Sequence, residues 1–83
     1  MHTQNWSVRI MIDEDDDHTH ARAVLASRDG VRLHGDGNAD RRPGDATIPE
    51  IGEELAAARA LYSLADQLMD VAVHDVENLS HPV

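Results

Sequence analysis

The stretch from Ala21 to Gly37, ARAVLASRDGVRLHGDG, decides the fold, because it has the pattern of one β-hairpin with a small or apolar residue at every second position. Such alternation is typical of half-buried strands. The turn is expected at residues 27–30. A three-residue loop with Gly30 as a left-handed bulge residue keeps the apolar residues on one face, whereas a two-residue loop turns one strand over. The favoured register has these pairs: Leu25 with Leu33, Ala23 with Gly35, and Ala21 with Gly37.

A further strand precedes this hairpin, because apolar residues occupy every second position of residues 5–12. The hairpin strands are expected over residues 19–27 and 31–37. The acidic run Asp13–His18 is expected to be a solvated loop, since like charges would crowd together in a strand. The three strands would form an antiparallel meander, with these pairs between the first and the second: Ile12 with Thr19, Ile10 with Ala21, Val8 with Ala23, and Trp6 with Leu25.

A long helix follows the meander. Residues 38–48 are rich in Asp, Arg, Pro and Gly and predict a loop, and Pro49 suits a first helical turn. We therefore predict a single α+β domain of residues 1–83, with a sheet over about 5–37, a loop over 38–48 and a C-terminal helix over about 49–79. Apolar residues recur along the helix in steps of four and three. This stripe consists of Ile51, Leu55, Ala58, Tyr62, Ala65, Met69, Ala72, Val76 and Leu79, and a second stripe (Leu61, Leu64, Leu68 and Val71) widens it.

The helix is too long for its own sheet. It would span about 46 Å, whereas strands of eight residues span about 26 Å. The stripe continues along the overhang, so we expect a second copy to cover it across a two-fold axis. A kink near Ser63 or His74 that folds the helix back is one alternative, and pairing through the open edge of an outer strand is another. The predicted interface of this homodimer, or higher assembly, is Tyr62, Ala65, Met69, Ala72, Val76 and Leu79.

Composition restricts the function classes. The chain has 16 acidic residues against 7 basic residues, all of them arginine, with a net charge of −9 and no cysteine. A disulfide framework and a cysteine zinc site are therefore impossible, and the acidity disfavours charge-driven binding to nucleic acid. The N-terminus lacks the features of a signal peptide, and no apolar stretch has the length of a membrane span. We expect a cytoplasmic protein that does not contact the membrane.

Candidate cation ligands are few. Asp13, Asp15 and Asp17 match the first three ligand positions of an EF-hand loop, but the glycine and the glutamate that complete such a loop are missing. A solvated loop is therefore favoured over a calcium site. His18 and His20 would share one strand face and are weak candidates for a metal site.

No catalytic constellation stands out. The pair Gly35-x-Gly37 lacks the third glycine of a nucleotide-binding fingerprint, and we interpret it as room for the helix against the sheet. The chain has no cysteine nucleophile, and its serines have no local motif. We therefore expect no cofactor and no enzymatic activity.

Most of the positive charge falls on the outward face of the predicted sheet and the loop after it. A basic sheet face can bind RNA or an acidic protein surface. However, Arg22 is expected opposite Asp36, and the face has no aromatic residue on which a base could stack. A solvated face with cross-strand ion pairs is the alternative. The residues that would bind RNA or a partner are Arg9, Arg22, Arg32, Arg41 and Arg42.

The run Ile48–Leu61, IPEIGEELAAARAL, resembles the signature of a small actinobacterial family of unknown function, as do Trp6, Thr19-x-Ala21 and Leu33-x-Gly35-x-Gly37. The resemblance covers nearly the whole chain. It implies a fold similar to double-stranded-RNA-binding domains without their first helix, in the order β-β-β-α. It also implies kinship with mycobacterial proteins associated with dormancy and hypoxic stress, and no catalytic residues.

Two functions follow from these observations. The favoured one is a non-enzymatic, stress- or dormancy-associated dimer that binds a protein partner. The alternative is an RNA- or ribosome-binding factor, similar to those of ribosome hibernation, that uses the arginine-bearing sheet face. That alternative rests on analogy of fold.

Overall fold

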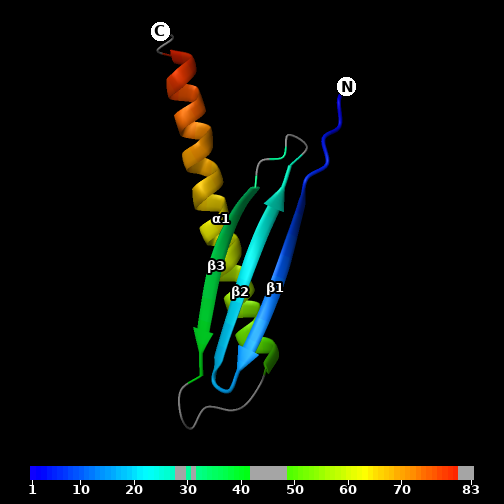
Figure 1. Cartoon of the computed structure of the whole chain (residues 1–83), viewed down its shortest axis with the longest axis vertical. Helices are drawn as coiled ribbons and strands as arrows, with labels where there is room; N and C mark the ends of the chain where they lie inside the picture. The colour runs from blue at the N-terminus through cyan, green and yellow to red at the C-terminus, as the bar shows by residue number, and fades with distance from the viewer. Residues whose placement is uncertain (28–29, 31, 42–48, 81–83) are drawn as a thin grey trace.

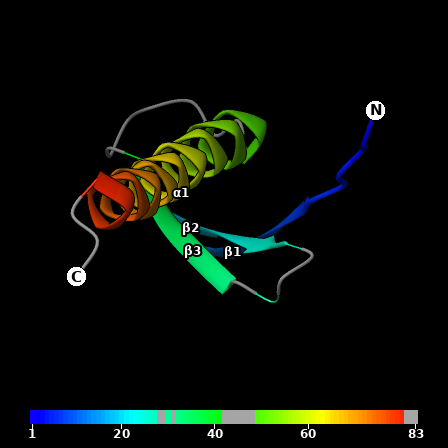
Figure 2. The same ribbon diagram turned by 90° about the horizontal axis from the view of Figure 1, so that it is seen from above.

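One sheet and one helix make up the part of the chain that the computed structural model describes, residues 1–27, 30, 32–41 and 49–80. The strands β1 (Ser7–Asp15), β2 (His18–Ala26) and β3 (Arg32–Asp40) form an antiparallel sheet in the order β1-β2-β3. The helix α1 (Pro49–Ser80) lies on one face of this sheet (Figure 1, Figure 2). The predicted order of three antiparallel strands and one long C-terminal helix is therefore confirmed.

The register between β2 and β3 is the predicted one, with Ala21 opposite Gly37 and Ala23 opposite Gly35. Gly30 has a φ of 76°, which a glycine adopts without steric cost, and its N–H donates a hydrogen bond to the carbonyl of Ser27 (3.1 Å). β3 extends three residues beyond its predicted end, because Ala39 is buried with the core instead of lying in the expected loop.

The predicted register between β1 and β2 is wrong by two residues. Val8, and not Trp6, lies opposite Leu25, and Ile10 lies opposite Ala23. Trp6 precedes the strand and is 53% exposed. A shift of two residues keeps every side chain on its predicted face, because the side chains of a strand alternate with a period of two.

The shift arises in the acidic run, which is mostly strand and not the expected loop. β1 continues through Asp15, and the turn is confined to Asp16 and Asp17, with Asp16 at a φ of 51°. The carboxylates do not face one another across the strands. Instead, Asp15 lies opposite His18 and Asp13 opposite a second histidine, His20.

The helix meets the sheet where the side chains are smallest. A Cβ at Gly35 would lie less than 3.0 Å from backbone atoms of Ala60 and Leu64, and a Cβ at Gly37 would lie equally close to backbone atoms of Ala56 and Ala60. The interpretation of these glycines as room for the helix is confirmed. The buried apolar core is accordingly thin: Ala21, Ala23, Leu25, Ala39, Ala56, Ala60 and Leu64.

The main apolar stripe of the helix does not face its own sheet. The sheet contacts the turn-spaced residues Ala56, Ala60 and Leu64, whereas Tyr62 and Met69 of the stripe point to solvent. The reason is steric, since backbones can approach closely only where alanine faces glycine. Of the two stripes, only Leu64 is buried and Leu68 packs partly against the core.

The molecule is elongated because α1 is one continuous helix of 32 residues, about 48 Å long, on strands of nine residues, about 30 Å long. The radius of gyration is 16.7 Å, against about 12 Å for a compact chain of this length. The C-terminal half of α1 extends beyond the sheet (Figure 1), so the helix does not fold back at a kink. Within the described residues, α1 is not apolar enough to cross a membrane.

Candidate functional site

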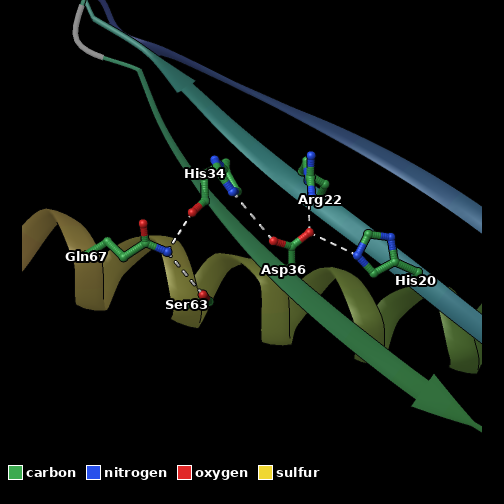
Figure 3. A network of polar contacts seen from close by, with 6 residues as sticks. All are labelled: His20, Arg22, His34, Asp36, Ser63 and Gln67. Carbon is green, nitrogen blue, oxygen red and sulfur yellow. Dashed lines mark hydrogen bonds and ion pairs between the residues drawn. The ribbon is translucent and has the colours of Figure 1, made fainter.

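The outward face of the sheet carries a cluster of charged groups around Asp36 on β3 (Figure 3). Its Oδ1 accepts a hydrogen bond from Nε of Arg22 (2.9 Å) and lies 2.9 Å from Nε2 of His20, both on β2. Nε2 of His34 lies 3.8 Å from its Oδ2. The Arg22 guanidinium, and after it His20, holds the pKa of Asp36 below its usual 3.8. As expected, Arg22 is ion-paired across the strands.

Two further ion pairs lie next to the β1–β2 turn. The imidazole of His18 binds the carboxylate of Asp40, and this hydrogen bond is the main reason why the pKa of His18 is raised above 6.5. Nε of Arg41 donates to the carboxylate of Asp17 (2.9 Å), and the backbone N–H of Arg41 donates to the Asp17 carbonyl (2.7 Å). These contacts fasten the end of β3 to the acidic turn.

The two weak metal candidates, His18 and His20, lie on the same strand face as predicted, but they turn to different carboxylates. His18 pairs with Asp40 and His20 with Asp36. Among the residues that the structure describes, no group of three or more histidine, aspartate or glutamate side chains is arranged to hold a metal ion.

The four candidate arginines that the structure describes do not form one basic patch. Arg22 and Arg41 are ion-paired with aspartates. Arg9 and Arg32 lie at the opposite end of the outward face from the acidic turn, opposite Val24 and Ala26 of β2. The remaining candidate, Arg42, lies outside the described residues.

An acidic contact that the sequence pattern does not indicate joins β1 to the start of α1. The side chains of Glu14 and Glu53 are hydrogen-bonded, and this contact raises the pKa of Glu53 above its usual 4.5. Glu50 and Glu54 add to the same effect through their charges. The helix periodicity alone could not reveal the contact, because it depends on where the first turn of α1 crosses the sheet.

The outer edge of β3 is occupied by side chains of the helix. Nη1 of Arg59 donates to the carbonyl of Asn38, and Nε2 of Gln67 donates to the carbonyl of His34, both at 2.6 Å. Figure 3 shows Gln67 reaching across from α1 to the strand. These two hydrogen bonds satisfy main-chain acceptors at an edge that would otherwise be open to another strand.

The helix-facing side of β1 is less well covered. Val8, Ile10 and Ile12, here called the β1 strip, point to the helix side of the sheet because they lie opposite the buried Leu25, Ala23 and Ala21. They are nevertheless 37–44% exposed. The cause is the course of α1, which lies over β2 and β3 and leaves β1 beside it (Figure 2).

A second apolar surface lies on the side of α1 opposite the sheet. We call it the helix seam, and its residues are all exposed: Tyr62 is 75% exposed and Leu79 80%. At one end, Ala58, Leu61, Tyr62 and Ala65 line a shallow hollow of about 400 Å³. The whole seam comprises Tyr62, Ala65, Met69, Ala72, Val76 and Leu79.

These features define a class: a small β-β-β-α protein with an ion-paired outward sheet face and an apolar surface left open on its helix side. Within that class, the chain belongs to the Rv2632c-like family, whose model matches residues 4–83. The resemblance to a small actinobacterial family of unknown function is thereby confirmed, since relatives of the chain are uncharacterised mycobacterial proteins.

Two relatives and one solved structure show how close this kinship is. The uncharacterised protein Mb1767 of Mycobacterium bovis is 44% identical over 78 residues, which cover 94% of this chain and 82% of that protein. The uncharacterised protein Rv2632c of Mycobacterium tuberculosis is 40% identical over 74 residues, covering 89% and 78%. The crystal structure of Rv2632c matches with a TM-score of 0.90 and 35% identity, covering 100% of this chain and 98% of that one.

Proposed function

We propose that this protein is a non-enzymatic interaction protein that works as a homodimer, or a larger homo-oligomer, through the helix seam. One observation carries the proposal: the most regular apolar stripe of the chain faces away from its own sheet. Large exposed apolar patches on small proteins mark sites of association. The partner that this stripe fits best is another helix, because its residues recur in steps of three and four.

The order of residue sizes along the helix seam favours a second copy as that partner. Large Tyr62, Met69 and Val76 alternate with small Ala65 and Ala72. Two such seams interdigitate when the large side chains of one helix enter the spaces over the small residues of the other, as in knobs-into-holes packing. The hollow at Ala58 and Ala65 provides such a space.

The polar groups support an interaction role more than a catalytic one. Asp36 and His18 on the outward face, and Arg41 directly after β3, are engaged in ion pairs and hydrogen bonds. The hollow on the helix seam has Tyr62 as its one residue with a polar side chain. The pairing of Arg22 and Arg41 also weakens the case for the RNA- or ribosome-binding alternative. A protein partner, a stress or dormancy role and a cytoplasmic location stay predictions.

The test is the mass in solution by light scattering, for the unmodified chain and for the seam variants Met69→Asp and Val76→Asp. The chain should exceed its 9.1 kDa monomer mass, and each variant should have a lower mass because it places a charge in the interface. The matched control is Asn78→Asp, which adds the same charge in the part of α1 beyond the sheet but on the side of the helix away from the seam, and it should leave the mass unchanged. Equal masses for the unmodified chain and both seam variants would refute the proposal.

A further inference from the structure

We propose that the free edge of β1 pairs antiparallel with β1 of a second copy, so that two chains share one continuous six-stranded sheet. This interface is separate from the helix seam and does not require it. It uses the other uncovered apolar surface of the molecule, the β1 strip.

The first argument is the difference between the two edges of the sheet. The β3 edge is occupied by Arg59 and Gln67, which donate to main-chain carbonyls. In contrast, all nine residues of β1 are exposed. β1 also lacks three of the usual protections of an edge strand, since it contains no proline, no lysine and no bulge in its pairing with β2. Of the two edges, β1 is the one that is open to another strand.

The second argument is that β1 is complementary to itself. A two-fold axis at Met11, the middle of Ser7–Asp15, pairs the strand over its full length. In this register Arg9 lies opposite Asp13 of the partner copy, which gives two ion pairs related by symmetry, and Ile10 lies opposite Ile12 of the partner copy. Shifting the axis to Arg9 would instead place two guanidinium groups face to face, which disfavours that register.

The third argument concerns the exposed apolar residues of β1, which this pairing accounts for. Met11 is 42% exposed on the outward, polar face of the sheet. On the two-fold axis it packs against its own symmetry copy. On the helix side, Ile10 and Ile12 of the two copies become neighbours and form an apolar centre between the two copies of α1, with Val8 of each copy opposite Glu14 of the other.

The absence of cysteine makes the register directly testable by disulfide formation. Paired residues of adjacent antiparallel strands have Cα atoms about 4.5–5.5 Å apart, within the range that a disulfide spans. Met11→Cys should therefore form a covalent dimer under mild oxidation. Ser7→Cys is the matched control on the same strand and face, and it should stay monomeric on a non-reducing gel because its symmetry copy lies about 27 Å away.

Two further variants separate this proposal from the helix seam and from a chance collision. Met11→Cys combined with Met69→Asp should still form the covalent dimer, even if the seam does not associate. Arg9→Asp should reduce the yield, and Arg9→Asp with Asp13→Arg should restore it. The proposal is overturned if Met11→Cys gives no covalent dimer, or if Ser7→Cys gives as much covalent dimer as Met11→Cys. It is also overturned if the charge-swapped variant does not regain the dimer yield that Arg9→Asp loses.

Discussion

On the helix-facing side of the sheet, the half under α1 and the half beside α1 differ in how well their apolar residues are buried. Under α1, β2 and β3 present alanine and glycine, and the helix backbone packs directly on Gly35 and Gly37. Beside α1, β1 presents the bulky Val8, Ile10 and Ile12, which stay more than a third exposed. The difference teaches that close backbone packing is complete within one chain, whereas the bulky residues remain available for another chain.

The largest effect is expected where the covered half is tightest. Gly35→Ala or Gly37→Ala places a Cβ less than 3.0 Å from helix backbone atoms, so α1 must lift from the sheet. Overpacking of this kind lowers the free energy of unfolding by about 1–3 kcal/mol or more. Urea denaturation measures the loss.

The matched control is Gly52→Ala, whose Cβ would meet the side-chain oxygen of Thr19 at 3.1 Å and no backbone atom of another element. Its effect should be much smaller than that of either sheet glycine. If the three alanine variants were equally stable, the close packing of α1 on β3 would be refuted.

The second prediction compares one bulky residue from each half. Leu64→Ala removes a side chain that is 4% exposed and should cost about 2–5 kcal/mol. Ile10→Ala removes a side chain that is 37% exposed in the single chain. Its effect on the melting temperature should grow with protein concentration, because the contacts that it removes are made with a second copy.

Thermal melts over a hundredfold range of concentration separate the two variants. Leu64→Ala should have a lower melting temperature than the unmodified chain already at the lowest protein concentration. If Ile10→Ala lowered the melting temperature by the same amount at every protein concentration, the β1 strip would not be covered by another chain.

The sequence predicts the half of the sheet under α1 better than the half beside it. The β2–β3 register was predictable because Leu25 and Leu33, and the small residues beside them, allow one alignment of the apolar faces. The β1–β2 register was not, because a shift of two residues preserves the faces, and the periodicity of residues 5–12 does not reveal that the strand continues through Asp15.

The length of the helix was predictable from the sequence, but the side of the helix that faces the sheet was not. Its strongest periodicity runs through Tyr62 and Met69, and nothing in that periodicity says whether the stripe meets the sheet or another chain. The sheet-facing side, with Ala56 and Ala60, is recognisable only together with Gly35 and Gly37, because small residues matter there through the close approach of two backbones. Asp36 as the centre of the polar cluster needed the positions of both His20 and His34.

The third prediction concerns the ion pairs that hold β2 to β3. Because Arg22 lowers the pKa of Asp36 below 3.8, the Asp36 carboxylate stabilises the fold above that pH, and the contribution is lost as the pH falls through the lowered pKa. Asp36→Asn should therefore lower the urea midpoint at neutral pH, by less than the glycine variants. The difference from the unmodified chain should shrink in acid below the lowered pKa. An equal difference at every pH would contradict this account of Asp36.

The smallest effect is expected at the contact between β1 and α1, where two carboxyl groups meet. Because Glu14 raises the pKa of Glu53 above 4.5, the folded state is most stable when Glu53 is protonated. It loses this stability as the pH rises through the raised pKa. Glu53→Gln should slightly raise the melting temperature at neutral pH and give no gain in acid. Glu54→Gln is the control for simple loss of charge in the same helical turn, and a gain as large as that of Glu53→Gln would contradict a specific role of the Glu14 contact.

The central claim is that further copies of the chain cover the β1 strip and the helix seam. Its most direct test is the light-scattering mass of the unmodified protein at about 100 µM, a concentration at which interfaces of micromolar affinity are occupied. The account predicts at least two chains of 9.1 kDa, or 18.2 kDa. A single species of 9.1 kDa would contradict it.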